Sequence, residues 1–119
     1  MASKRSICWA VIAVYAALIL VTAVIPIPEG PELPHLDKVV HLCEYLLLAW
    51  LMSIALRAGG LTAHDYLILA WIYATSYGLL IELIQGLLPW RSADLCDAAA
   101  NAAGAAIGVW LGRRLPKCI

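Results

Sequence analysis

Apolar residues in this 119-residue chain fall into four long runs separated by short polar stretches. The runs cover about residues 7–27, 39–56, 66–88 and 95–115, and the first carries no charged side chain. A helix needs about 20 apolar residues to cross the hydrocarbon core of a bilayer. Each run is close to that length, and helices satisfy their own backbone polar groups in lipid. The pattern therefore predicts an all-α bundle of four transmembrane helices.

Composition supports a single membrane domain over residues 1–119. Hydrophobic residues make up 64% of the chain and charged residues only 13%, against roughly 25% charged residues in soluble domains. The formal net charge is zero, so nucleic acid is not an expected partner. The first apolar run is longer than the core of a usual signal peptide, and we expect it to be retained. The bilayer is the expected partner, and the oligomeric state is open.

Basic residues predict the orientation of these helices, because cytoplasmic loops are enriched in Lys and Arg. With the N-terminus inside, six basic residues fall on the cytoplasmic side and two on the outer side. The six are Lys4, Arg5, Arg57, Arg113, Arg114 and Lys117, and the two are Lys38 and Arg91. The distribution predicts that both termini lie in the cytoplasm.

Three polar clusters lie at ends of the second, third and fourth runs: DKVVH, ELIQ and RSADLCDAAAN. Ionisable groups beside apolar segments are costly, and in membrane proteins they commonly mark functional sites. Because successive spans reverse direction, all three clusters are expected on the outer side, around one shared polar pocket. The candidate residues are Asp37, Lys38, His41, Glu44, Glu82, Gln85, Arg91, Asp94, Asp97 and Asn101.

This set holds five carboxylates, which cannot all be ionised in a partly buried pocket without compensation. A divalent metal could supply it, as could protons shared among the acids, or ion pairs with Lys38 and Arg91. In an enzyme, His41 would act with Glu82 or Asp97 as an acid–base pair or as metal ligands. Lys38 and Arg91 would then hold an anionic group. The residues assigned to ligand binding besides these two are Asp37, Glu44, Gln85, Asp94 and Asn101.

Structural roles compete with these assignments. Asp37 and Asp94 stand where helix N-caps belong, and Arg91 could pair with Asp94 or Asp97 within a loop. Asn101 could hydrogen-bond between packed helices. A network that only holds the helices together would belong to a non-catalytic binding or scaffold protein. A proton-coupled transporter is less favoured, because the four short spans include no discontinuous helix.

Small residues dominate the fourth apolar run. The stretch AAANAAGAAIG, residues 98–108, contains Gly104 and Gly108, and Gly112 follows at the same four-residue interval. Small residues at this spacing allow two helix backbones to approach closely in a bilayer. We therefore expect the fourth helix to lie at the packed centre of the bundle.

The order of the polar clusters resembles the VanZ-like family, whose pattern is D-K-x-x-H, then E-x-x-Q, then R-x-x-D-x-x-D-x-x-x-N-x-x-G. The family is named for a bacterial membrane protein linked to resistance to the glycopeptide antibiotic teicoplanin. The resemblance implies a multi-pass protein of the bacterial cytoplasmic membrane whose extracytoplasmic site serves cell-envelope chemistry. Its ligand would be a cell-wall precursor, a lipid-linked glycan or a glycopeptide. The matching positions are Asp37, Lys38, His41, Glu82, Gln85, Arg91, Asp94, Asp97, Asn101 and Gly104.

Overall fold

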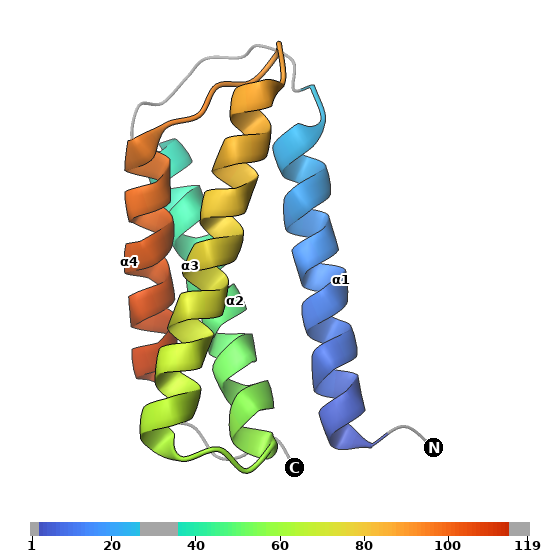
Figure 1. Ribbon diagram of the computed structural model, residues 1–119, viewed down its shortest axis with the longest axis vertical. Coiled ribbons are helices and arrows are strands. Elements are labelled where there is room, and N and C mark those ends of the chain that lie inside the picture. Colours follow the sequence, from blue (N-terminus) through green and yellow to red (C-terminus); the bar gives the residue numbers. More distant parts are fainter. Residues whose placement is uncertain (1–2, 27–35, 115–119) are drawn as a thin grey trace.

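The computed structural model describes residues 3–26 and 36–114, and these residues form four helices and no strand (Figure 1). The helices are α1 (Lys4–Val24), α2 (Leu36–Ala58), α3 (Ala63–Leu87) and α4 (Leu95–Gly112). Each is long and apolar enough to cross a membrane. The predicted all-α bundle of four membrane-spanning helices is therefore confirmed. The predicted outer limits at residues 27 and 115 lie outside the described residues.

Side chains just before three of the helices satisfy backbone N–H groups that the first turn leaves free. Ser3 accepts from the backbone of Ser6 before α1, and Thr62 accepts from that of Asp65 before α3. Asp94 accepts from Cys96 N at 2.8 Å before α4, as its sequence position suggested. Asp37 differs from that expectation, because α2 already includes Leu36 and Asp37 lies inside its first turn.

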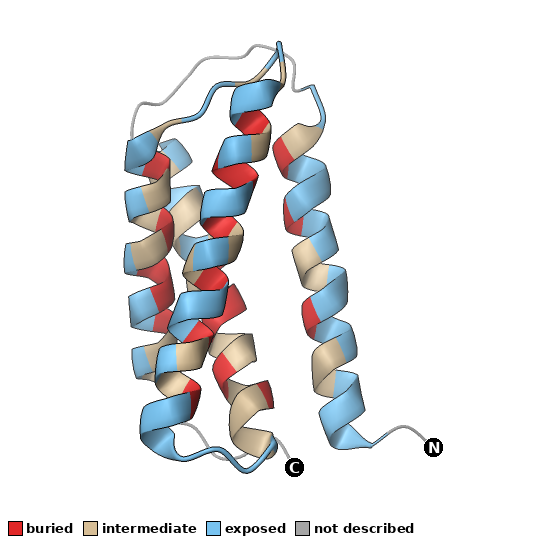
Figure 2. Ribbon diagram, in the orientation of Figure 1, coloured by how far each residue is buried: buried red, intermediate tan, exposed pale blue. Residues whose placement is uncertain are grey.

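The closest contact in the bundle is between α2 and α4, where glycines of α4 face the backbone of α2. A Cβ atom at Gly104 or Gly108 would overlap the backbone oxygen of Leu42 or Leu46. In Figure 2 the buried residues lie along the side of α4 that faces α3 and recur along α3. The glycine series therefore serves close helix packing, as its spacing predicted.

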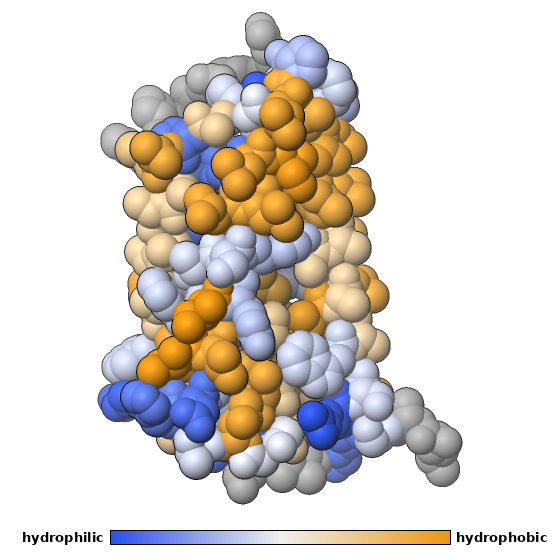
Figure 3. All heavy atoms as spheres, in the orientation of Figure 1, coloured by the Kyte–Doolittle hydropathy of each residue, from blue (hydrophilic) through white to orange (hydrophobic). Residues whose placement is uncertain are grey.

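Helix α1 is the least buried of the four and stands to one side of the others (Figure 1). Its only buried residues are Ile12, Ile19 and Ala23. Much of the remaining surface of the bundle is apolar, and Figure 3 shows apolar side chains over a large part of one face. Such a surface suits contact with lipid chains rather than water.

The two ends of the bundle differ in charge. The end of α3 and the starts of α2 and α4 lie together with the three polar clusters, and we call this the polar end. The start of α1 and the ends of α2 and α4 lie at the opposite, basic end. The described basic residues at that end are Lys4, Arg5, Arg57, Arg113 and Arg114.

Candidate functional site

The ammonium group of Lys38 joins the start of α2 to the start of α4. Its Nζ donates to Asp94 Oδ2 at 2.8 Å and to Asp97 Oδ1 at 2.5 Å. It also lies 3.6 Å from Asp37 Oδ2. The side chain of Asp97 is only 9% exposed, so this contact neutralises a nearly buried carboxylate. Lys38 is thus shared among three carboxylates.

Asp94 lies just before α4 and has three functions at once. It caps the helix, it accepts a hydrogen bond from Lys38, and its backbone N–H donates to Glu82 Oε2 at 3.0 Å. The hydrogen bond from Lys38 holds the pKa of the Asp94 carboxyl below its usual value, and the bond from Cys96 N adds to this effect.

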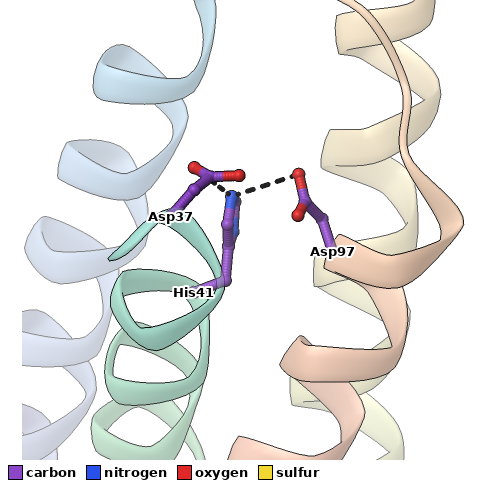
Figure 4. Close-up of side chains that lie close together, drawn as sticks. All are labelled: Asp37, His41 and Asp97. Carbon is purple, nitrogen blue, oxygen red and sulfur yellow. Dashed lines mark ion pairs between the residues drawn. The ribbon is translucent and has the colours of Figure 1, made fainter. Parts of the chain in front are cut away.

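His41 lies between two carboxylates, one from its own helix and one from α4 (Figure 4). Its Nε2 is 3.5 Å from Asp37 Oδ1 and 3.5 Å from Asp97 Oδ2. The two oxygens of Asp97 therefore face different partners, Lys38 and His41. One donor atom from each of Asp37, His41 and Asp97 can be chosen so that all lie within 4.8 Å of one another.

Glu82 is buried, with 4% of its surface exposed, although it is a carboxylate inside a membrane-spanning helix. Its Oε2 receives the hydrogen bond from the Asp94 backbone, which holds the start of α4 against the end of α3. Its Oε1 has no hydrogen-bond partner among the described residues. Buried polar atoms are usually paired, so this carboxylate oxygen is an exception within the described part of the bundle.

Asn101 and Tyr45 extend the polar groups deeper into the bundle. Each is 1% exposed, and both lie against Gly78 of α3. The hydroxyl of Tyr45 and both amide atoms of Asn101 lack hydrogen-bond partners within the described part of the chain. The interhelical hydrogen bond considered for Asn101 is therefore not formed with a described residue.

Gln85 and Arg91, two further residues of the predicted site, reach the end of α1. Gln85 Nε2 donates to Ala23 O at 3.0 Å. Arg91 Nη2 donates to Thr22 O at 2.8 Å and to Ile25 O at 3.0 Å. Helix ends leave their last carbonyl groups without intrahelical partners, and these two side chains supply donors for three of them.

Trp90 completes this contact by donating from Nε1 to Val24 O at 2.7 Å. We call Gln85, Trp90 and Arg91 the α1 clasp. The expected pairing of Arg91 with Asp94 or Asp97 does not occur among the described ion pairs. Sequence reasoning missed the clasp because free carbonyls at a helix end carry no side-chain signal.

A cavity of about 170 Å³ lies between α1, α2 and α3 at the polar end. Five predicted site residues line it, while Lys38, Glu82, Asp94, Asp97 and Asn101 do not. The structure thus divides the candidate residues between this cavity and the α2–α4 contact, with Asp37 and His41 belonging to both. The lining residues are Ile19, Thr22, Ala23, Asp37, Val40, His41, Glu44, Tyr45, Ile81, Gln85 and Arg91.

The contribution of α1 to the cavity was not predicted. Ile19, Thr22 and Ala23 carry no ionisable group, so nothing in the pattern separated them from residues that face lipid.

A larger groove of about 440 Å³ lies between α3 and α4, but its lining is wholly apolar. We place no chemistry there, because a groove of that kind on a membrane helix surface accommodates lipid chains. Its lining residues are Leu67, Ile68, Trp71, Ile72, Ala106 and Val109.

Comparison with known proteins agrees with the order of the polar clusters. The model of the family described as VanZ/LLP1 matches residues 7–115, which is nearly the whole chain. No curated protein and no solved structure matches the chain. The chain belongs to the VanZ/LLP1 family.

Proposed function

We propose that this member of the VanZ/LLP1 family recognises or modifies the polar part of a cell-envelope ligand at the polar end of its bundle. The polar end would face outward from the bacterial cytoplasmic membrane, with both termini inside. The observation that carries the proposal is the cavity of about 170 Å³, whose lining combines Asp37, His41, Glu44 and Arg91 with apolar residues. Ligand sites typically combine an apolar lining with a few polar groups in this way.

The size of the cavity limits which part of a ligand it can enclose. Sites for drug-sized molecules measure roughly 300–1,000 Å³, well above the 170 Å³ found here. A whole glycopeptide antibiotic would not fit inside. A terminal group of a lipid-linked glycan or cell-wall precursor would fit, while its lipid chain stayed in the surrounding bilayer.

Donors and acceptors in the cavity suit such a group. The carboxylate of Glu44 makes no hydrogen bond or ion pair with a described residue, although its backbone oxygen accepts from Tyr15. Arg91 uses only Nη2 for its described hydrogen bonds to α1. We assign the Glu44 carboxylate to ligand hydroxyl or amine groups, and Nε and Nη1 of Arg91 to a ligand carbonyl or anionic oxygen.

The catalytic form of the proposal assigns proton transfer to His41, whose Nε2 faces Asp97 at 3.5 Å. Paired with a carboxylate, an imidazole can accept and return a proton near neutral pH. Glu82 would act through its second oxygen, which has no described partner. The remaining assigned ligand contacts, Lys38, Asp94 and Asn101, would act from the α2–α4 side.

A second candidate function is a non-catalytic binding or scaffold protein whose polar residues hold the helices together. The α1 clasp favours this alternative for Gln85 and Arg91, because both already bind α1 carbonyls. The bonds of Lys38 to Asp94 and Asp97 favour it for the α2–α4 contact. Glu44 distinguishes the two candidate functions. Its carboxylate forms no bond to another described helix, so a purely structural role would not require it.

The test is a binding measurement with the full chain in lipid nanodiscs and a purified lipid-linked cell-wall precursor. We expect saturable binding that Glu44→Gln weakens at least tenfold while the melting temperature stays unchanged. Asp65→Asn is the matched control, because Asp65 is an exposed acid at the basic end. Teicoplanin and phosphatidylglycerol serve as separate arms, to distinguish an antibiotic or a bulk lipid from the precursor.

If Glu44→Gln bound the precursor as tightly as the wild type, the cavity would not be the binding site. No binding of precursor or teicoplanin would favour the scaffold function. The catalytic form makes one further forecast. His41→Ala, folded normally, should abolish conversion of a bound precursor, and unchanged conversion would exclude His41 as the acid–base residue.

A further inference from the structure

We propose that Asp37, His41 and Asp97 bind a divalent transition-metal ion of the Zn²⁺ class at the edge of the cavity. The donor atoms are Asp37 Oδ1, His41 Nε2 and Asp97 Oδ2, two from the start of α2 and one from α4. One imidazole nitrogen with carboxylate oxygens is a ligand set that Zn²⁺ accepts.

The two distances from His41 Nε2 to the carboxylate oxygens fit a metal better than they fit hydrogen bonds. His41 Nε2 lies 3.5 Å from both carboxylate oxygens, which is too long for a good N–H···O bond. Ligands at 2.0–2.2 Å from a tetrahedral Zn²⁺ are separated by about 3.3–3.6 Å. The three donor atoms lie within 4.8 Å of one another, and the side chain of Asp37, 61% exposed, has room to move closer and complete the set.

Charge at the site gives an independent reason for a cation. Asp37, Asp94 and Asp97 lie around one ammonium, that of Lys38. Glu82, 4% exposed, lies beside them with one oxygen on the Asp94 backbone and the other without a described partner. The three carboxylates around Lys38, when ionised, leave two negative charges in a partly buried region. A divalent ion offsets that excess.

Lys38 prepares Asp97 for this role. Its Nζ holds Oδ1 of Asp97 at 2.5 Å, which leaves Oδ2 turned toward His41. Groups that hydrogen-bond to a ligating carboxylate fix its orientation and contribute to metal affinity. Three protein ligands would leave the fourth tetrahedral position open, as in catalytic zinc sites.

This inference rests on the proposed function, because it names what the same site holds. Asp37 and His41 also line the cavity, so an ion bound there could contact a group inside it. With Nε2 on the metal, His41 would be a ligand in place of an acid–base residue, and the metal would polarise an oxygen of that group or activate a water molecule. Binding of the metal alone, without any envelope ligand, tests the inference separately.

The experiment uses the full chain, prepared without a histidine tag, stripped with a chelator and titrated with Zn²⁺ in detergent. We expect one Zn²⁺ per chain, and visible d–d absorption of a tetrahedral centre when Co²⁺ replaces it. His41→Ala and Asp97→Asn each remove a ligand and should weaken binding by more than the roughly 10–100-fold that loss of an outer-shell partner costs. Asp37→Asn gives a third test, because its exposed side chain can lose its charge without loss of folding.

His64→Ala and Asp65→Asn are matched controls at the basic end, where both residues are exposed, and they should bind Zn²⁺ like the wild type. The inference would be overturned if the wild type bound no Zn²⁺. It would also be overturned if Asp37→Asn and His41→Ala both bound Zn²⁺ as tightly as the wild type. Zn²⁺ binding without precursor binding would retain the metal site and remove the proposed function. If the chain bound the precursor but no Zn²⁺, the proposed function would stand and the metal site would be excluded.

Discussion

Lys38 Nζ lies 2.5 Å from Asp97 Oδ1 and so joins the first turn of α2 to the first turn of α4. The same two helices are in close contact further along, where Gly104 faces the backbone of Leu42. The ion pair adds a directional contact at one end, which fixes their relative position.

Removing the positive charge of Lys38 alone should therefore destabilise the bundle more than removing the charges of both Lys38 and Asp97. Lys38→Met leaves the nearly buried Asp97 without its cation, and an unpaired charge costs more than an apolar replacement of both partners. We expect the melting temperature in detergent to fall in Lys38→Met and to recover in part in Lys38→Met/Asp97→Asn. A double variant that is less stable than the single one would contradict this role.

Asp94 predicts how stability depends on acid pH. Its pKa is lowered from 3.8 in the folded protein, first by the hydrogen bond from Lys38. A group with a lowered folded pKa stabilises the fold above its unfolded pKa, and this contribution is lost as pH falls through the folded value. The Asp94 contribution should thus be complete above about pH 4 and decrease below it. Melting temperatures of the wild type and Asp94→Asn across pH 2–6 should converge at the acid end.

The α1 clasp predicts a stability cost for Gln85→Leu. The substitution leaves Ala23 O without its buried donor, which costs about 1–3 kcal/mol of unfolding free energy. Hydrogen exchange of amides near the end of α1 should also increase. Thr75→Val is the matched control, because the Thr75 hydroxyl is buried without a described partner and its removal should be neutral or stabilising. A neutral Gln85→Leu would mean that the clasp does not hold α1.

Gly104→Ala tests the close approach of α2 and α4. The new Cβ would overlap the backbone of Leu42, which cannot rotate away as a side chain could. We expect a loss of about 1–3 kcal/mol, although alanine favours helices more than glycine does. Gly86→Ala is the control, because its Cβ would meet only the Ala93 side chain, at 3.2 Å. Unfolding in detergent, followed by circular dichroism, measures both.

The fold was largely predictable because it depends on patterns that repeat over many residues. Four apolar runs of spanning length predicted the four helices. Glycines at four-residue intervals predicted the side of α4 that packs closely against α2. The starts of α2 and α3 each lie three residues before the expected positions. The apolar run of α2 was expected to begin near residue 39, but the helix begins at Leu36 because the polar residues Asp37 and Lys38 are helical too.

The site was predictable as a group of residues at one end, but the partner of each residue was not. Lys38 and Arg91 looked equivalent in the sequence as anion-binding cations. In the structure Lys38 contacts carboxylates, whereas Arg91 donates to carbonyls of α1. The difference arises from α1, whose backbone groups and small side chains give no signal in a pattern of charges.

The orientation of the protein in the membrane is the remaining prediction. The proposed function depends on it, because a cell-envelope ligand can reach the polar end only if that end faces outward. Five described lysines and arginines lie at the basic end, and two, Lys38 and Arg91, lie at the polar end, which predicts that the basic end is cytoplasmic. Green fluorescent protein fused after Ile119 should fluoresce, and alkaline phosphatase fused there should be inactive. Replacing Arg113 and Arg114 with glutamine is a test of the cause, because it weakens the charge bias and should reduce the fluorescent fraction. An active phosphatase fusion on the unaltered chain would place the polar end in the cytoplasm and exclude an external envelope ligand.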